Sequence, residues 1–286
     1  MLLGVLVGLC ALAVAVLFLV LPAESSAEMR APFWGVNFAH RGLHTEDRAT
    51  PENSLAAFTA AVDAGYGIEL DVQLSREGEV VVFHDDTLQR VCGADGKVED
   101  HTLEELRGFR LFDTQQGIPT LWETLYVVKG RVPLLVELKR GARNRQLCEA
   151  TWKIVRTYEG DVCFQSFDPR IVGWFKRHVP GALRGQLAAT PKALGGLGGF
   201  LVGNGLSHFW GRPHFIAHEK GRMAPLMHLA RRFAMRLVWT ARPGDDPEAL
   251  EDKNEAVIFE FYEPEPRFAP PPETPGSWPE DEDYRF

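Results

Sequence analysis

Three short apolar stretches near the start of the chain each contain charged or titratable groups. They are FAHRG at 38–42, GIELDVQL at 67–74 and VVVFHDD at 80–86. Burying such a group without a partner is costly, so each must be paired or must bind a metal. The crowding of six of these groups into one short region predicts a charged site built on strand ends. The six are His40, Arg41, Glu69, Asp71, His84 and Asp85.

Composition allows a sizeable core and excludes one large class of function. Of the 286 residues, 45% are apolar and 10% aromatic, which is ample for a folded domain of this size. The net charge of −8 and the pI near 5.6 argue against a nucleic-acid binder, which would carry a basic patch. Four cysteines without a CxxC pair indicate neither a disulfide framework nor a zinc cluster.

The composition of the first twenty or so residues indicates a membrane segment. Residues 2–21 contain no charge and no proline, and about 20 apolar residues are needed to span a bilayer as a helix. We interpret 1–22 as a transmembrane anchor; the alternative is a signal peptide cleaved near Ser25-Ser26-Ala27, which would give a secreted protein. Arg30, on the C-terminal flank, favours a catalytic domain that faces the cytoplasm.

The rest of the chain divides into a linker, one large domain and a tail. Residues 23–32 are predicted to be a linker, and the folded domain is predicted to begin near Phe33 and to cover 33–263. From 264 to 286 the sequence is rich in proline and acidic residues and poor in apolar ones, which predicts a disordered acidic tail.

Two local patterns fix the structure near the charged groups. Only SREGE separates the second and third apolar stretches, which is too short for a parallel crossover and predicts an antiparallel hairpin. A turn centred near Arg76 and Glu77 would set Glu69 opposite His84. The run Thr50-Pro51-Glu52 resembles a capped helix start, so we expect a helix over 51–64.

Apart from the return strand of that hairpin, eight apolar runs alternate with mostly helical segments. This order predicts an α/β fold, a (β/α)8 TIM barrel with a β-hairpin insertion after strand 2, preceded by one transmembrane helix. Chemistry in such barrels lies at the C-terminal strand ends. The residues expected there are His40, Arg41, Glu69, Asp71, Glu137, Lys139 and Trp239.

These residue types together suit hydrolysis of a phosphate ester. Glu69, Asp71 and Glu137 offer carboxylates without a thiolate, which suits one hard divalent cation, Mg²⁺ or Ca²⁺. Two histidines on separate strands can act as general acid and base. Arg41 and Lys139 can hold an anion.

Each of these residues also has a purely structural interpretation. A histidine can be a satisfied core group, and Glu69 or Glu137 can be one half of an internal ion pair. Glu52 and Asn53 fit a helix start with no further role. Trp239 fits a packing residue at a strand end, unless a ligand stacks on it.

The motifs, in order, resemble the glycerophosphodiester phosphodiesterase family. They are AHRG, PENSLAAF, ELDVQLSREGEVVVFHD, LLVELK, QSFD and VWT, spread over about residues 38–241. The resemblance implies a phospholipase-C-like barrel with an inserted hairpin after the second strand. The family's usual ending, WTVN followed by a GVDGIITD-like strand, is replaced here by WTARPGDDPEALEDKNEAVIFEFYEP.

The resemblance also implies roles for individual residues. His40 and His84 would be the catalytic pair, while Arg41 and Lys139 would bind the phosphate. One divalent cation would be held by Glu69, Asp71 and Glu137, with Glu52 either among the ligands or lying just behind them. The implied reaction is hydrolysis of a glycerophosphodiester to sn-glycerol 3-phosphate and an alcohol, with water or the glycerol 2-hydroxyl as nucleophile.

Three other functions fit parts of the sequence. The anchor and the glycine-rich segment 191–205 suggest a lysophospholipase D that acts on membrane lysolipids. An inactive barrel could serve as an anchored ligand-binding module, but the set of site residues is complete. A metal-dependent hydrolase of another ester is the third. The expected partners are a small-molecule substrate and the membrane.

Overall fold

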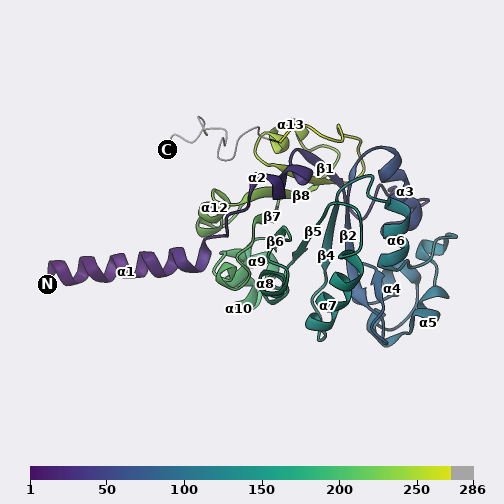
Figure 1. The fold of residues 1–286 in the computed structure, drawn as a ribbon, viewed down its shortest axis with the longest axis horizontal. Coiled ribbons are helices and arrows are strands. Elements are labelled where there is room, and N and C mark those ends of the chain that lie inside the picture. Colours follow the sequence, from purple (N-terminus) through teal and green to yellow (C-terminus); the bar gives the residue numbers. More distant parts are fainter. Residues whose placement is uncertain (272–286) are drawn as a thin grey trace.

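The computed structural model describes residues 1–271 and shows eight parallel strands closed into a barrel (Figure 1). Strand β1 pairs with both β2 and β9, so the sheet has no open end. The predicted (β/α)8 barrel is therefore confirmed. Its strands are β1 Val36–Ala39, β2 Gly67–Leu74, β4 Leu134–Leu138, β5 Val162–Ser166, β6 Arg184–Ala188, β7 Phe215–Glu219, β8 Met235–Ala241 and β9 Ala256–Phe259.

Helices cover the outside of the barrel, and one helix leaves it (Figure 1). Capping boxes begin two of them: Thr102 and Thr120 each accept a hydrogen bond from the backbone N–H three residues on. The α-helices are α1 Leu2–Val20, α2 Ala27–Arg30, α3 Leu55–Asp63, α4 Gln89–Cys92, α5 Leu103–Arg107, α6 Leu121–Val128, α7 Asn144–Val155, α8 Pro169–His178, α9 Pro191–Leu194, α10 Gly196–Gly203, α11 His208–Gly211, α12 Pro225–Arg231 and α13 Pro247–Glu251. Three 3₁₀ turns are η1 Ala31–Phe33, η2 Val98–Asp100 and η3 Leu111–Asp113.

The interior of the barrel changes from apolar to polar along the strands. Side chains alternate between the two faces of a strand, so Leu135 and Glu137 of β4 both point inward. Leu135 packs with Phe38, Phe215 and other apolar side chains in a dry inner cluster. Glu137 follows toward the C-terminal end, where the inner positions become charged. The apolar layer stabilises the barrel and leaves the polar layer at its mouth.

The inserted hairpin is present, but its register differs from the prediction by one residue. Strand β3, Val80–Val82, is antiparallel to β2, with Val72 opposite Val82. The turn is centred on Glu77, because Ser75 N–H bonds Glu79 C=O and Gly78 adopts a left-handed φ of 98°. Extending this register places Asp85, not His84, opposite Glu69.

The helix expected over 51–64 begins four residues later than predicted. Its N-cap is Ser54, whose Oγ accepts a hydrogen bond from Ala57 N–H at 3.1 Å. Asn53 has a left-handed φ of 53°, which no residue inside a right-handed helix can adopt. The three residues before the cap instead form a turn that reaches toward the barrel mouth.

The segments on either side of the domain pack more closely than expected. The predicted linker contains α2 and η1, and Phe33 is buried in the inner cluster. Asn37 N–H donates to Pro266 C=O, and Phe268 N–H donates to Gly35 C=O, so this part of the predicted tail is bonded to the domain. Gly35 is required there, since a Cβ would lie 1.8 Å from Ala269 O. Residues 272–286 of the predicted tail lie outside the described residues.

Candidate active site at the C-terminal strand ends

Three carboxylates meet inside the barrel at the ends of neighbouring strands. Asp71 on β2 lies beside Glu137 on β4 in the parallel register, and Glu69 shares their face. Their oxygens come within 4.8 Å of one another, and all three residues are buried. Oxygen-only sets of this kind suit hard cations such as Mg²⁺ and Ca²⁺. The structure thus brings together the three predicted metal ligands.

The three carboxylates differ in their affinity for a proton. Burial, together with the other two carboxylates, raises the pKa of Glu69 well above its ordinary value, and burial also raises the pKa of Glu137. Burial acts in the same direction on Asp71, but nearby positive charges outweigh it and hold its pKa below the ordinary value. Those charges belong to Lys139, His84 and Arg41. A divalent cation would relieve the repulsion among the three, so the residues fit such an ion.

Two positive side chains border the triad. Lys139 Nζ lies 2.9 Å from Glu137 Oε1 and 3.3 Å from Asp71 Oδ1. Arg41 Nη1 donates to Glu52 Oε1 at 2.7 Å, while its Nε lies 3.7 Å from Asp71 Oδ2. Both cations are therefore held at the mouth beside the carboxylates. They can bind an anionic group that approaches the triad.

The backbone around Arg41 is held in an unusual conformation by the turn before α3. Arg41 has a φ of 56°, and its N–H donates to Glu69 Oε2 at 3.2 Å. Asn53 N–H donates to Arg41 C=O at 2.8 Å, and Asn53 Nδ2 donates to Asp71 Oδ2 at 2.9 Å. Two left-handed non-glycine residues in contact are characteristic of functional sites. Asn53 is thus a positioning group, which its structural interpretation as part of a helix start does not capture.

His40, directly after β1, is held by a carboxylate that the sequence analysis missed. Its Nδ1 lies 2.8 Å from Glu260 Oε2, and Glu260 directly follows β9. Hydrogen bonds from His40 and Arg242, with His44 Nε2 a further 3.7 Å contact, outweigh burial and hold the pKa of Glu260 below its ordinary value. Burial lowers the pKa of His40 to about 4 in spite of this partner. His40 is therefore neutral near pH 7 and donates its Nδ1 proton to an ionised Glu260.

His84 has a carboxylate partner of its own. Its Nδ1 lies 2.6 Å from Asp85 Oδ1, and Arg90 Nε donates to Asp85 Oδ2 at 2.6 Å. Arg90 also donates to both oxygens of Glu52, at 2.7 and 2.8 Å. The two arginines around Glu52 outweigh its burial and lower its pKa to about 2. Arg90 thus connects Asp85, which contacts His84, to Glu52, which contacts Arg41.

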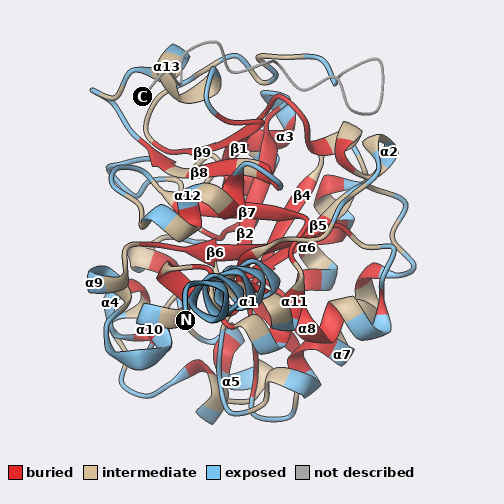
Figure 2. Ribbon diagram, turned by 90° about the vertical axis from the view of Figure 1, so that its left-hand side faces the viewer, coloured by how far each residue is buried: buried red, intermediate tan, exposed pale blue. Residues whose placement is uncertain are grey.

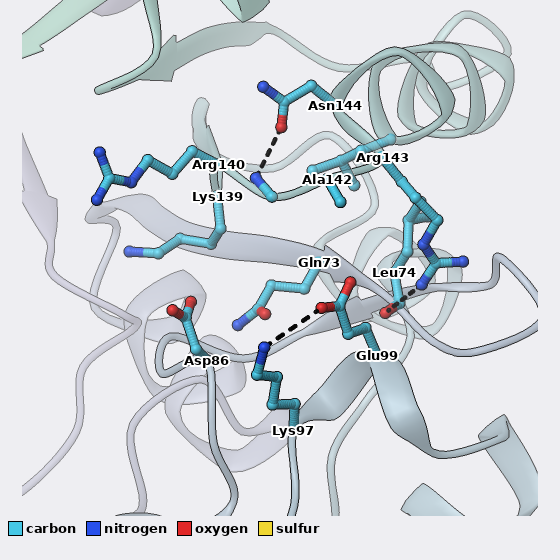
Figure 3. A pocket seen from close by; sticks show the side chains of 12 residues that line it. Gln73, Leu74, Asp86, Lys97, Glu99, Lys139, Arg140, Ala142, Arg143 and Asn144 are labelled. Atoms are coloured by element: carbon cyan, nitrogen blue, oxygen red, sulfur yellow. Dashed lines mark hydrogen bonds and ion pairs between the residues drawn. The ribbon is translucent and has the colours of Figure 1, made fainter. Parts of the chain in front are cut away.

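Two pockets open beside Lys139. One is polar and is lined by β2, the inserted hairpin region and the loop before α7; Lys139 and Asp86 extend to the same side of it (Figure 3). The other, of about 310 Å³, has Glu137, Lys139 and Phe167 on the barrel side and α9 and α10 on the other. Trp239 packs edge-to-face on Phe167 and donates its Nε1–H to Ala217 C=O. The predicted contact between Trp239 and substrate stays a prediction.

Sequence reasoning missed residues that act through others. Glu260 ends the apolar run AVIF, which is the same signal that revealed Glu69 and Glu137. Asn53 and Arg90 carried no such signal, because Asn53 lies in a loop and Arg90 in a short helix, and neither follows an apolar strand. His214 and His218 are buried.

Comparisons with known proteins agree with this geometry. The model of the glycerophosphoryl diester phosphodiesterase family matches residues 40–187. A glycerophosphodiester phosphodiesterase of Caldanaerobacter subterraneus subsp. tengcongensis is 40% identical over 111 residues, 36% of this chain and 44% of the relative. One of Bacillus altitudinis is 38% identical over 109 residues, 36% of this chain and 43% of the relative. The matched part spans less than half the length of these relatives.

Solved structures match over most of their length. The glycerophosphodiester phosphodiesterase of Thermotoga maritima is 28% identical with a TM-score of 0.59, and the match covers 78% of this chain and 93% of that one. A phosphodiesterase of Oleispira antarctica, solved with sn-glycerol-3-phosphate, is 23% identical with a TM-score of 0.63, covering 79% and 93%. The second likeness supports the fold.

Proposed function

The chain belongs to the glycerophosphoryl diester phosphodiesterase family, and from this premise we propose that it hydrolyses glycerophosphodiesters to sn-glycerol 3-phosphate and an alcohol. One observation carries the proposal. A buried carboxylate triad, two positive side chains and two histidines, each with a carboxylate partner, converge at the mouth of the barrel. The names of the relatives point to the same reaction.

Glu69, Asp71 and Glu137 would hold one divalent cation, Mg²⁺ or Ca²⁺. When bound, such an ion neutralises charge that develops on the phosphoryl oxygens. The raised pKa of Glu69 and of Glu137 supports this role, because both groups are poorly solvated carboxylates without enough positive charge nearby.

Arg41 and Lys139 would bind the phosphate. Arg41 donates a hydrogen bond from Nη1 to Glu52, which leaves the other donors of the guanidinium available to the phosphate oxygens. Lys139 lies between Glu137 and Asp71, so its charge lies at the edge of the cation site. Together they would fix the diester with its phosphorus next to the triad and both histidines.

The two histidines would divide the proton transfers. His40 is neutral, and its Nδ1 proton is donated to Glu260, so Nε2 carries the lone pair that accepts the proton of the nucleophile. His84 is more exposed and lies against Asp85. As the general acid it would give a proton to the departing alcohol, after which the proton on His40 returns to solvent and His84 takes up another. Attack by water would give sn-glycerol 3-phosphate directly, whereas attack by the glycerol 2-hydroxyl would give a cyclic phosphate that water must then open.

We place the enzyme at a membrane. Helix α1 is the one helix within 1–271 that is long and apolar enough to cross a bilayer. Its last turn is part of the folded domain, since His208 Nδ1 lies 2.8 Å from Val20 O and Arg212 donates to Leu21 C=O at 2.7 Å. Cleavage near Ala27 would remove both partners, which favours a retained anchor over a signal peptide. Arg30 favours a domain that faces the cytoplasm.

A second candidate substrate is a lysophospholipid, cleaved by the same site. The 310 Å³ pocket has an apolar wall formed by α9 and α10, beside Lys139 and Glu137. The residues of this wall are Ala193, Leu194, Gly198, Gly199 and Val202. Such a wall could accept an acyl chain, whereas a deacylated diester needs only the polar part of the site.

The test compares two substrates with one protein. Full-length protein in detergent micelles is given glycerophosphocholine or lysophosphatidylcholine, and the phosphorus product and choline are measured. Cleavage of glycerophosphocholine supports the first proposal, and cleavage of the lysolipid alone supports the second. His40→Ala and His84→Ala should each abolish either activity while circular dichroism stays unchanged; near-normal turnover in one variant would remove that histidine from the mechanism.

A further inference from the structure

We propose that the side of the barrel around the base of α1 is a membrane-interface surface that rests on anionic phospholipid, in the same bilayer that α1 spans. This surface, called here the α1-base surface, combines exposed apolar residues with basic ones that form no ion pair within residues 1–271. The apolar residues are Leu197, Phe200, Trp210 and Phe233. The basic residues are Lys176, Arg177, Lys192, Arg222 and Arg232. The proposal requires that α1 is retained in the mature protein, and it does not depend on the hydrolytic reaction.

Helix α1 is fixed to the barrel, so the barrel has a defined orientation relative to any membrane that α1 crosses. Val20 is fully buried, and its carbonyl is bonded by His208. Arg212 bonds the next carbonyl and lies over the ring of Phe18, 4.6 Å from its centroid. Ala23 N–H donates to Pro213 C=O at 3.0 Å. Figure 2 looks along α1 and shows α10, α11 and α12 grouped around it.

The length of α1 sets the depth of these neighbours. Its 19 residues extend about 28 Å at about 1.5 Å per residue, close to the roughly 30 Å of a hydrocarbon core. The whole helix is therefore needed to cross the membrane, including its last turns. Val16 and Leu19 pack against the same apolar cluster as Val202 of α10 and Met227 of α12. Helices that meet the last turns of the span must lie at the boundary of the bilayer.

Exposed apolar side chains gather on this side of the protein. Leu197 is 76% exposed, Phe233 57%, Phe200 51% and Trp210 45%. Outside α1, the other large apolar side chains exposed within 1–271 are Trp122 and Tyr126, which stack on each other on α6. Aromatic and apolar groups in such numbers favour the interfacial region over water.

The charge of this part of the chain matches an anionic surface. Residues 169–244 contain twelve lysines and arginines but a single acid, Glu219, in a protein of net charge −8. Lys192, Arg222 and Arg232 are exposed and form no ion pair with any other residue of the described 271. Each basic residue near a membrane surface adds attraction to anionic lipid. The combination of apolar and basic groups fits phospholipid better than a protein partner.

The α1-base surface would also fix where substrate enters. Helix α10 carries two of the exposed residues, Leu197 and Phe200, and its residues Gly198, Gly199 and Val202 line the pocket beside Lys139. One wall of the mouth would therefore lie at the bilayer surface.

The experiment measures membrane contact directly. The full chain carries Cys10→Ala and Cys92→Ala, while Cys148 and Cys163 remain because they are buried. A polarity-sensitive fluorophore is attached at Phe200→Cys, or at Trp122→Cys on α6, which lies on the side away from α1 (Figure 1). The protein is reconstituted into phosphatidylcholine vesicles, with or without phosphatidylglycerol, that contain a nitroxide-labelled lipid. We expect several-fold stronger quenching at position 200 than at 122, and a further increase with phosphatidylglycerol.

Two controls separate the parts of the proposal. A label on native Cys10, with Cys92→Ala, reports insertion of α1 and must be quenched; if it is not, the retained span and the surface are both wrong. If Cys10 is quenched while positions 200 and 122 are quenched alike, the α1-base surface is overturned. The triple variant Lys192→Glu, Arg222→Glu and Arg232→Glu should lose the increase with phosphatidylglycerol. Persistence of that increase would refute the preference for anionic lipid.

Discussion

His40 Nδ1 lies 2.8 Å from Glu260 Oε2, across the junction where the first and last strands close the barrel. The carboxylate is held ionised by its hydrogen bonds, so it can only accept, and the proton must reside on His40 Nδ1. Nε2 is left as an acceptor. His84 and Asp85 form a second pair of this kind at 2.6 Å. Both histidines are thus oriented before substrate binds.

Glu260→Gln should slow turnover without unfolding the protein. The amide keeps the volume of the side chain but no longer fixes the tautomer of His40. We expect kcat to fall by about tenfold to a hundredfold, less than the roughly 10²–10⁴-fold contribution of a general base itself. Steady-state assays check this, with Glu263→Gln, an exposed neighbour, as the control. Equal activity in the two variants would mean that Glu260 does not orient His40.

The acid side of the pH profile should report His40. Burial lowers its pKa from 6.5 to about 4, so the neutral, proton-accepting ring persists well below the ordinary value. The value of kcat/KM should therefore stay high through pH 6.5 and fall only as the pH approaches about 4. The profile is measured with saturating cation. A loss centred near 6.5 would show that His40 is solvated and is not the base described here.

Cation binding should release protons and stabilise the fold. Because the pKa of Glu69 is raised well above its ordinary value, a divalent ion competes with a proton for this carboxyl. Calorimetric titration with Mg²⁺ or Ca²⁺ in two buffers of different ionisation enthalpy measures the release. Cation at about 100 times its Kd should stabilise the folded state by about 2.7 kcal/mol. Glu69→Gln should lose both effects, and a variant that kept them would exclude Glu69 as a ligand.

Arg90→Gln should weaken two catalytic groups at once. Arg90 bonds Asp85, the partner of His84, and also Glu52, which holds Arg41. We expect kcat to fall because His84 is less well oriented, and KM to rise because Arg41 is less well held. If only one of these two effects operates, only one constant should change. Steady-state kinetics separates the two, with the exposed Arg145→Gln as the matched control. A change in KM alone would disprove the link to His84.

The stability of the full chain should fall in mild acid. Burial lowers the pKa of His208 to about 4. Between pH 6.5 and about 4, His208 is therefore protonated in the unfolded chain but neutral in the folded one. The stabilisation present above pH 6.5 is lost as the pH falls toward 4, by about 3 kcal/mol for this one group. Thermal unfolding at pH 7 and pH 4.5 measures the loss. His208→Gln should show a smaller change between the two pH values, and an unchanged difference would refute this origin.

The sequence predicted the parts of the fold that depend on local patterns. Apolar runs alternating with helices predicted the closed barrel, and the five-residue spacing after β2 predicted the hairpin. The carboxylates Glu69, Asp71 and Glu137 could be grouped because alternation along parallel strands fixes which side chains share a face. The geometry of the site thus followed from periodicity and strand order.

What the sequence could not predict depends on backbone detail and on distant contacts. The hairpin register shifted by one residue because the left-handed Gly78 centres the turn on Glu77. The helix start moved because Asn53 turns toward Asp71, 18 residues away. The contact between His40 and Glu260 joins residues 220 positions apart. No local pattern indicates such a pair until the barrel closes.

The most direct test of the account is release of sn-glycerol 3-phosphate from glycerophosphocholine by the full chain, with EDTA and after cation is restored. The account predicts release that EDTA stops and that Mg²⁺ or Ca²⁺ restores, and no restoration in Glu69→Gln. Release that continues undiminished in EDTA would contradict it, because the carboxylate triad would then have no part in the reaction.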